Sequence, residues 1–356
     1  MSPIATSDWD RVVEAIVSAR SLLLLGHVSP DGDALGSALG AGLALASMPG
    51  DRRIEVSFGD DPFVVPANLA WMPGENLLTP AVEVSPDPDV VLTFDASSID
   101  RLGLLREIAE KAPLLVAVDH HRSYDGFGHV ALVDVEAPAT AVVAHELIAR
   151  LGIALDPAIA ACLYTGLITD TGSFRYAGTT PQTHALAGEL LETGIAFDTI
   201  AREVFDAVPF GYLGVLGTAL GRCQLEQAAA GGHGLVWTAV LAADRAIDRL
   251  PFDLVEPIID VVRKASEAEV AMVVKEDDLG DLRVSLRSKG VADVSAVAIG
   301  LGGGGHRYAA GFTATSRDLT EVVDTVRRSL DAAIIDPGIV DPGIVDPGIV
   351  DPGVDG

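Results

Sequence analysis

The sequence predicts an α/β protein with two domains. Short apolar runs alternate with helical segments along the first half of the chain, which is typical of a mainly parallel sheet flanked by helices. A mostly helical stretch from Thr180 to about Ala230 then leads into a second β/α section that opens at Gly231-Gly232. The length of 356 residues is also typical of about two domains.

The elements expected in the first domain follow this alternation. Asp8–Arg20 is predicted to be an amphipathic helix, because Ser7 or Asp8 can cap it. The remaining strands are the short apolar runs, and the helices are the longer segments between them. In chain order they are strand Leu22–Leu25, helix Ala38–Met48, strand Arg53–Phe58, loop Pro62–Pro80, strand Val90–Phe94, helix Ile99–Lys111, strands Leu114–Val118 and Val130–Val133, and helices Thr140–Leu151 and Pro157–Thr169.

The second section is expected to be smaller. Its predicted strands are Leu235–Val240, Val270–Lys275, Leu282–Arg287 and Gly311–Thr315, and its helices are Asp293–Ile299 and Leu319–Ala333. We therefore expect a first domain over residues 1–206, a helical connector over 207–231 and a smaller α/β domain over 232–334, with the active-site cleft between the two domains.

The end of the chain differs in composition from the rest. Asp-Pro-Gly-Ile-Val begins at residues 336, 341 and 346, and a proline in each repeat excludes a helix. Residues 335–356 are therefore interpreted as a low-complexity, disordered tail.

Composition and charge restrict the partners. Hydrophobic residues make up 49% of the chain and charged residues 21%, which is ordinary for a globular protein. With 51 acidic and 24 basic residues the net charge is -27, so neither a long nucleic acid nor an anionic membrane is an expected partner. Cys162 and Cys223 have no metal-type spacing and are interpreted as free thiols. Neither a signal peptide nor an apolar span of about 18 residues is evident, and a cytoplasmic location is expected.

A loop between the first predicted strand and the next helix carries one His and two Asp. Pro30 and Gly32 favour a tight turn there, which can aim His27, Asp31 and Asp33 at one point. The same stretch taken alone fits an ordinary Asp-Gly turn in which Asp33 caps the next helix.

Other potential metal ligands also follow predicted elements. Asp95 follows strand Val90–Phe94, Asp119-His120-His121 follows strand Leu114–Val118, and Asp170 ends a helical pattern. Each could be a cap or a turn residue, but the carboxyl ends of parallel strands lie on one edge of a sheet. Two imidazoles and several carboxylates suit Mn²⁺ or a similar ion. They also suffice for two ions that share a bridging carboxylate and act together on a phosphoryl group.

The second section offers candidates for phosphate contacts. Gly300–Gly305 fits the pattern G-x-G-x-x-G, but a helix precedes it and a strand follows, so it is not a dinucleotide fingerprint. It is either a backbone loop that approaches a phosphate or a glycine-rich turn between layers. Arginines are further candidates because they bind phosphate bidentately, although each could be a solvated surface residue. The second-section candidates are Arg287, Ser288, Gly303, Gly304, Gly305 and His306, and Arg175 in the first domain is a further one.

Taken together, the motifs resemble the DHH phosphoesterases. The resemblance rests on the stretch His27-Val-Ser-Pro-Asp-Gly-Asp33, on Asp95-Ala-Ser-Ser, on Asp119-His-His121 and on Asp170-Thr-Gly-Ser-Phe. The second section is similar to their associated domain through Arg283-Val-Ser-Leu-Arg-Ser-Lys289 and Gly302-Gly-Gly-Gly-His306. The resemblance covers about residues 8–334 and is strongest to the bifunctional oligoribonuclease/PAP phosphatases, or nanoRNases, a group that includes enzymes acting on cyclic di-AMP.

The resemblance implies a role for each motif residue. One metal would be held by His27, Asp31 and Asp95, and a second by Asp33, Asp95, His120 and Asp170. Asp119 would orient His120, and His121 would face the substrate phosphate, so His121 and Asp119 are the expected catalytic residues. The expected substrate contacts are the second-section candidates and Arg175, although the stretch after Arg175 departs mildly from the family's Asn-containing version.

The expected function is metal-dependent hydrolysis of short oligoribonucleotides and linear dinucleotides, and of PAP or cyclic di-AMP, by water activated on two Mn²⁺ ions. The preferred substrate and the oligomeric state are left open, although homodimers are common among the enzymes that the sequence resembles. Enzyme alternatives are a RecJ-like exonuclease and a pyrophosphatase or polyphosphatase, which would need a second domain richer in cations. A nucleotide-sensing module without turnover is the alternative from another class. The few cations that the second section offers are Arg283, Arg287, Lys289 and Arg307.

Overall fold

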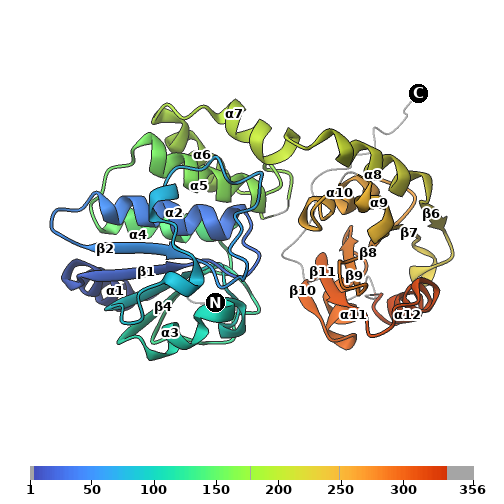
Figure 1. The fold of residues 1–356 in the computed structure, drawn as a ribbon, viewed down its shortest axis with the longest axis horizontal. Helices are drawn as coiled ribbons and strands as arrows, with labels where there is room; N and C mark the ends of the chain where they lie inside the picture. The colour runs from blue at the N-terminus through green and yellow to red at the C-terminus, as the bar shows by residue number, and fades with distance from the viewer. Residues whose placement is uncertain (1–3, 177, 248, 335–356) are drawn as a thin grey trace, which may run out of the picture. The chain divides into compact units, whose positions relative to one another are not determined.

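The computed structural model describes residues 4–176, 178–247 and 249–334, so the predicted tail at 335–356 lies outside the described residues. The chain divides into two compact units that separate between Ala207 and Val208. Figure 1 labels many of the helices and strands of both units.

The first unit is built on a five-stranded sheet in which every pair is parallel. The strand order is β2-β1-β3-β4-β5, so the direction of winding reverses between β1 and β3. In open α/β sheets, ligands bind outside the carboxyl ends of the strands at such a reversal. The strands are β1 (Ser21–Leu25), β2 (Arg53–Ser57), β3 (Val90–Phe94), β4 (Leu114–Asp119) and β5 (Val130–Val133).

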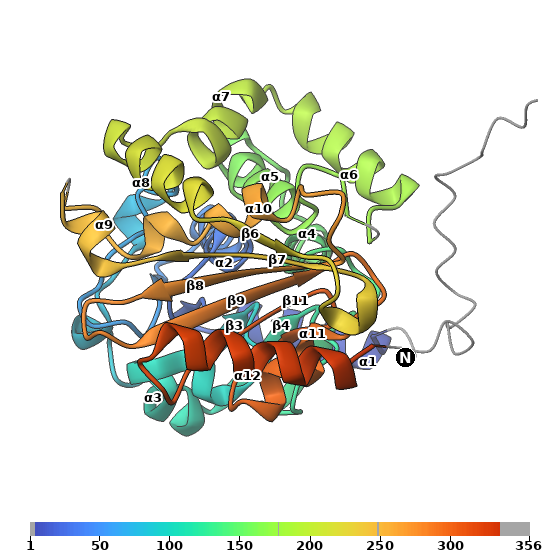
Figure 2. The ribbon, with the colours of Figure 1, turned by 90° about the vertical axis from the view of Figure 1, so that its right-hand side faces the viewer.

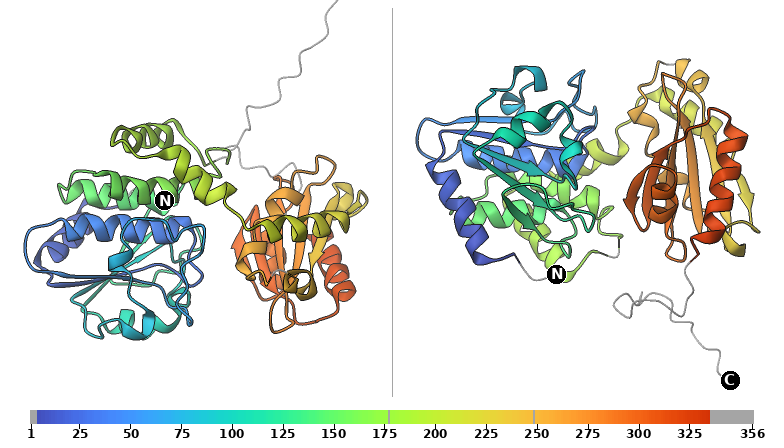
Figure 3. Two further views of the ribbon diagram at one scale, coloured as in Figure 1. Left: turned by 45° about the horizontal axis from the view of Figure 1, so that its top comes forward. Right: turned by 90° about the horizontal axis from the view of Figure 1, so that it is seen from below.

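Both faces of this sheet are covered, which explains why its central strands read as continuous apolar runs. One face packs in the larger core against α1 (Thr6–Ser18), α2 (Gly32–Ala46), α4 (Thr140–Arg150), α5 (Pro157–Asp170) and α6 (Pro181–Glu192). The other face packs against η2 (Ala81–Glu83), η3 (Ile99–Leu105) and α3 (Arg106–Lys111). Figure 3 shows α2 and α5 side by side on their face of the sheet. The unit also contains η1 (Glu75–Leu77), α7 (Phe197–Ala201) and η4 (Arg202–Asp206).

The second unit contains a mixed sheet of six strands in the order β10-β11-β9-β8-β7-β6, in which only β7 and β8 pair in parallel. Helices α11 (Val294–Gly300) and α12 (Leu319–Ala332) share one core with it, and α8 (Phe210–Gly221) and α10 (Ile258–Val262) share another (Figure 2). The strands are β6 (Gln224–Glu226), β7 (Leu235–Val240), β8 (Val270–Glu276), β9 (Leu282–Ser288), β10 (Gly304–His306) and β11 (Ala309–Thr313). Short helices η5 (Ala230–Gly232), α9 (Ala242–Ala246) and η6 (Asp253–Val255) complete the unit.

The α/β class predicted from the sequence is confirmed, and several elements differ in detail. Helix α2 begins at Gly32 rather than at Ala38, because the Asp31 carboxylate accepts hydrogen bonds from the first backbone N–H groups. The predicted helix Ile99–Lys111 is divided into η3 and α3, and η3 is kinked at Gly103, which has a φ of 52°. Strands β6 and β10 were not predicted.

Residues 207–231, expected as a helical connector, contain α8, β6 and η5. Helix α8 packs into a core of the second unit through Tyr212, Val215 and Ala219. Among the described helices, none alone is long and apolar enough to cross a membrane, whereas the bent pair Phe197–Asp206 and Phe210–Gly221 would reach that length and composition together.

Candidate metal centre

The predicted ligands gather at one edge of the first sheet. His27 lies just beyond β1, Asp95 directly follows β3, and His120 and His121 follow β4. These strands are neighbours and run in parallel, so their carboxyl ends meet at the point where the strand order reverses. Asp31 and Asp33 lie at the start of α2, and Asp170 is the last residue of α5.

The side chains form three overlapping groups that could hold a metal ion. In each group, one ligand atom from every member lies within 4.8 Å of the others. The groups are His27, Asp31 and Asp95; Asp33, His120 and Asp170; and Asp95, His120 and His121.

The Nε2 atoms of two imidazoles face these carboxylates. His27 Nε2 lies 3.6 Å from Asp95 Oδ2 and 3.8 Å from Asp31 Oδ2. His120 Nε2 lies 3.0 Å from Asp170 Oδ2 and 3.4 Å from Asp95 Oδ1. Asp95 therefore lies between the two halves of the cluster.

Asp95 adopts an unusual backbone conformation. Its φ of 60° is in the left-handed region, which costs a non-glycine residue roughly 1 kcal/mol or more and is found most often at functional sites. The backbone N–H of Asp95 donates to the Val118 carbonyl at 3.1 Å, and the Thr140 hydroxyl donates to Asp95 Oδ1 at 2.8 Å. The surrounding structure thus holds the carboxylate at the centre of the cluster.

Asp33 is held by the N-terminus of a helix distant in the sequence. Its two carboxylate oxygens accept the backbone N–H groups of Thr140, at 2.6 Å, and Ala141, at 2.9 Å. The Ser37 hydroxyl donates to the same carboxylate at 3.1 Å. A side chain at Gly166 on α5 would begin only 2.7 Å from Asp33 Oδ1, so the close packing of α2 on α5 depends on a glycine there.

Asp119 lies differently from the position implied by the resemblance. Its Oδ1 accepts hydrogen bonds from His121 Nδ1 at 2.7 Å and from the backbone N–H of His120 at 2.8 Å. The ring of His120 instead places Nδ1 3.1 Å from the carbonyl of Ala137. The expectation that Asp119 orients the ring of His120 is therefore corrected. Asp119 orients His121, and the Ala137 carbonyl orients His120.

The carboxylates of the cluster favour the protonated form of its imidazoles. Burial by itself lowers the pKa of His27, but the hydrogen bonds and charges of Asp31 and Asp95 outweigh it and raise that pKa to about 10. Burial also opposes protonation of His120, yet the nearby carboxylates, led by Asp170, raise its pKa to about 11. Burial raises the pKa of Asp170 to about 6.

This donor set fits divalent cations. It combines imidazole nitrogens with carboxylate oxygens, a mixture that suits ions such as Mn²⁺. In the metal-free protein, protons on the imidazoles offset part of the negative charge of the neighbouring carboxylates. A metal ion bound to the same imidazoles would displace those protons. Asp119 Oδ2, moreover, is buried without a hydrogen-bond partner among the described residues.

Two residues at this edge were not found by sequence reasoning. The first is Thr140, whose hydroxyl and backbone contact two predicted ligands. The second is Arg101 on η3, whose guanidinium Nη2 lies 2.9 Å from His27 Nδ1. The only sequence signal for Arg101 is its place shortly after Asp95, on the same connection.

The substrate contacts predicted in the second unit differ in their burial and in their hydrogen-bond partners. Arg287 is half-buried on β9 and donates to the Leu286 carbonyl at 3.0 Å. Ser288 is buried, and its hydroxyl donates to Glu269 Oε1 at 2.7 Å. The main chain of His306 lies in register with Ala309, which is in register with Arg287 on the next strand.

The glycines of this unit have a packing explanation. A Cβ at Gly303 would overlap the carbonyl oxygen of Gly311, and Gly305 has a φ of 134° and packs against Ala310. Gly304 begins β10, which pairs with β11. The pattern thus allows a short strand to lie directly on its neighbour.

Arg175 lies in the first unit, shortly after Asp170. It is exposed, and its Nε donates to the Gly172 carbonyl at 2.5 Å.

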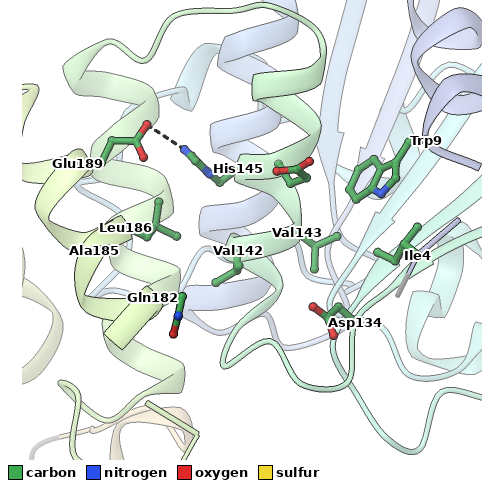
Figure 4. Close-up of a pocket in the computed structure, with 11 residues that line it drawn as sticks. Ile4, Trp9, Asp134, Val142, Val143, His145, Gln182, Ala185, Leu186 and Glu189 are labelled. Atoms are coloured by element: carbon green, nitrogen blue, oxygen red, sulfur yellow. Dashed lines mark hydrogen bonds and ion pairs between the residues drawn. The ribbon is translucent and has the colours of Figure 1, made fainter. Parts of the chain in front are cut away.

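A surface pocket lies elsewhere in the first unit. Figure 4 shows it between α1, α4 and α6, where Trp9, His145 and Glu189 are among the residues that line it. His145 Nε2 lies 3.3 Å from Glu189 Oε1. None of the residues that line this pocket is a predicted site residue, so we assign it no catalytic role.

Comparison with known proteins agrees with the motifs. The N-terminal domain of the DHH family matches residues 21–167, and the DHHA1 domain matches residues 242–332. The chain is 32% identical over 337 residues to the bifunctional oligoribonuclease and PAP phosphatase NrnA of Thermus thermophilus, across 91% of this chain and 96% of that protein. It is 25% identical to the cyclic-di-AMP phosphodiesterase GdpP of Bacillus subtilis, across 89% of this chain and 48% of that protein.

A solved structure has the same fold over most of the chain. It is an exopolyphosphatase-related protein from Bacteroides fragilis, 25% identical in sequence, with a TM-score of 0.83 over 93% of this chain and 98% of that one. Fold, motifs and whole-length similarity to a named relative thus agree, and the chain belongs to the DHH family of phosphoesterases.

Proposed function

We propose that this enzyme hydrolyses phosphoester bonds in short oligoribonucleotides and in PAP. The observation that carries the proposal is the cluster of overlapping ligand groups at the carboxyl ends of β1, β3 and β4. It lies in a chain similar along nearly its whole length to a protein named as an oligoribonuclease and PAP phosphatase. Cyclic di-AMP is a further candidate substrate, supported by the similarity to GdpP.

The cluster is proposed to hold two Mn²⁺ ions. One would be bound by His27, Asp31 and Asp95, and the other by Asp33, His120 and Asp170, with Asp95 shared between them. When bound, the ions would supply Lewis-acid activation of water and of the phosphoryl group. The protein's contribution is to fix the ligands in advance, as the hydrogen bonds to Asp33 and Asp95 do.

Other residues are proposed to contact the substrate. His121 is oriented through Nδ1 by Asp119, so its other ring nitrogen is placed to meet a phosphoryl or leaving-group oxygen. Contacts to the rest of the nucleotide are proposed for Arg175, and for Arg287, His306 and the main chain of Gly303–Gly305 in the predicted 232–334 domain.

Short substrates are proposed because the chain's charge opposes long ones. A net charge of -27 gives no long-range attraction for RNA, so affinity has to come from the metal centre and a few cations. Each further phosphate of a long strand would meet an acidic surface. We expect turnover to be fastest on dinucleotides and to fall steeply beyond roughly five nucleotides.

The test is a turnover panel with the full chain. The substrates are RNA of two, five and 24 nucleotides, PAP, cyclic di-AMP and pyrophosphate, each with Mn²⁺ and after chelation. Asp95→Asn should be inactive, and Asp100→Asn, at an exposed carboxylate on η3, is the matched control. Equal rates on the dimer and the 24-mer would favour a RecJ-like exonuclease. Turnover of pyrophosphate alone would favour a pyrophosphatase, and ligand binding without turnover would favour a sensing module.

A further inference from the structure

Arg101 carries a positive charge beside the metal centre and has no acidic partner. It is exposed on η3, and its carbonyl accepts the backbone N–H of Val28 at 2.8 Å, which ties it to the loop that carries His27. Its guanidinium Nη2 lies 2.9 Å from His27 Nδ1. Within the part of the chain that the structure describes, it forms no ion pair with Asp or Glu.

This lack of a partner distinguishes Arg101 from arginines nearby. Arg106, on the same connection, pairs with Asp100 and with Glu110, the latter at 2.9 Å. Arg122, which follows His121, pairs with Glu136 at 2.7 Å. Acidic residues outnumber basic ones by 51 to 24 in this chain, so an arginine left without one is available for another anion.

The contact between Arg101 and His27 is incompatible with metal binding through Nε2. His27 Nδ1 has two neighbours, the Val28 carbonyl oxygen at 2.8 Å and Arg101 Nη2 at 2.9 Å. The carbonyl needs a hydrogen on Nδ1, whereas the guanidinium needs a lone pair there, and one ring nitrogen cannot provide both.

A metal ligand bound through one ring nitrogen usually donates its other N–H to a carbonyl or carboxylate. His27 Nε2 is the nitrogen that faces Asp31 and Asp95, so Nδ1–H would donate to Val28. With that hydrogen on Nδ1, His27 offers Arg101 no acceptor, although Arg101 lies beside the cluster.

We propose that Arg101 binds a phosphoryl group of the substrate at the side of the centre formed by His27, Asp31 and Asp95. This inference rests on the function proposed above, because it requires an anionic phosphoester. Guanidinium is planar and matches two phosphoryl oxygens at once, which makes arginine the usual residue for this contact. The side chain of Asp31 is about half exposed, so this side of the cluster is open to solvent.

The test compares Arg101→Met and Arg101→Lys with Arg106→Met, a control on the same connection whose arginine is already paired. For the Mn²⁺-loaded proteins we measure kcat and KM on a dinucleotide and the affinity for inorganic phosphate by calorimetry. Mn²⁺ affinity is measured separately, without substrate, and circular dichroism checks that each variant folds.

Arg101→Met should raise KM and weaken phosphate binding by roughly 10–100-fold, which is the loss expected for a charged hydrogen bond. Arg101→Lys should recover part of that loss, Arg106→Met should behave as wild type, and Mn²⁺ affinity should change little in all three. Reduced Mn²⁺ affinity with unchanged KM would overturn the proposal and make Arg101 a positioning residue for His27. Unchanged KM and phosphate affinity would also overturn it.

The outcome also separates this inference from the proposed function. If the wild type hydrolyses no phosphoester but Arg101→Met still weakens phosphate binding to the Mn²⁺-loaded protein, the proposed function fails and the phosphate contact stands. If the wild type is active and Arg101→Met matches it in KM, the function stands and the contact fails.

Discussion

Replacing Thr140 with Val tests how the metal centre is held. Thr140 is fully buried at the first position of α4, where its hydroxyl donates to Asp95 Oδ1 at 2.8 Å and its backbone N–H to Asp33 Oδ2 at 2.6 Å. Valine has nearly the same shape and keeps the backbone N–H. The substitution therefore removes one hydrogen bond to Asp95 and leaves both hydrogen bonds from α4 to Asp33.

The expected effect follows from the charge of the acceptor. A hydrogen bond to a charged group contributes about 1.5–3 kcal/mol, and its loss leaves one oxygen of a buried carboxylate without its donor. Asp95 also has a positive φ and depends on its surroundings to stay in place. We expect Mn²⁺ affinity to fall by roughly 10–100-fold, the usual cost of removing a residue that orients a metal ligand.

Calorimetric titration of chelator-treated protein with Mn²⁺ measures this effect directly. Thr140→Ser keeps the hydroxyl and should bind Mn²⁺ nearly as the wild type does. At saturating Mn²⁺, KM of Thr140→Val should be close to normal, because Thr140 is not among the proposed substrate contacts. Wild-type Mn²⁺ affinity in Thr140→Val would refute the reasoning, and an equal loss in Thr140→Ser would show that the methyl packing matters instead.

Three further predictions follow from the site and the second unit. Asp95→Asn should abolish turnover while leaving the circular dichroism spectrum unchanged, and Mn²⁺ should restore activity to chelated wild type but not to this variant. In the metal-free protein the pKa of His27, raised to about 10 from 6.5, stabilises the fold fully below pH 6.5, and this stabilisation is lost toward pH 10, so Tm should fall over that range. Gly303→Ala should destabilise the second unit by roughly 1–3 kcal/mol in urea, since its Cβ would overlap Gly311.

Each of these predictions has an outcome that contradicts it. Activity in chelated wild type would remove the need for metal ions. A Tm of the chelated protein that is constant between pH 6.5 and 10 would show that the His27 proton is not coupled to folding. If Gly303→Ala kept full stability but lost nucleotide turnover, the glycine would serve the substrate rather than the packing of β10.

The clustering of the candidate metal ligands could be predicted because parallel sheets place strand ends together. His27, Asp95 and His120 each follow an apolar run, and runs of that kind form the central strands β1, β3 and β4. The order of the strands was not needed for this prediction, because the carboxyl ends of all strands in a parallel sheet lie on one edge. The local sequence was therefore sufficient to predict which candidate ligands lie at this edge of the sheet.

The residues that support the ligands could not be predicted in this way. Thr140 and Ala141 meet Asp33 only because α4 begins at the sheet edge, 107 residues further along the chain. Arg101 is adjacent to His27 through the fold rather than through the sequence. Such contacts depend on how helices pack on the sheet, which hydrophobic periodicity does not specify.

The alternation of side chains along a strand separates two of the predicted substrate contacts. Side chains of neighbouring residues in a strand point to opposite faces of the sheet. The structure extends the predicted strand Leu282–Arg287 by one residue, so Arg287 and Ser288 are neighbours in β9 and their side chains leave the sheet on opposite faces. The structure places Arg287 half-buried and Ser288 inside, against Glu269.

The choice between a helix cap and a metal ligand, which the sequence left open, is not a real alternative at this site. A carboxylate has two oxygens, and Asp31 uses Oδ1 to accept the N–H groups of Asp33 and Ala34, both at 3.0 Å, while Oδ2 faces His27. Asp33 in turn accepts the first N–H groups of α4. Helix N-termini stabilise the charged form of a carboxylate and fix its direction. These ligands are thus oriented by the fold itself, before any metal binds, and chelation should remove activity without unfolding the first unit.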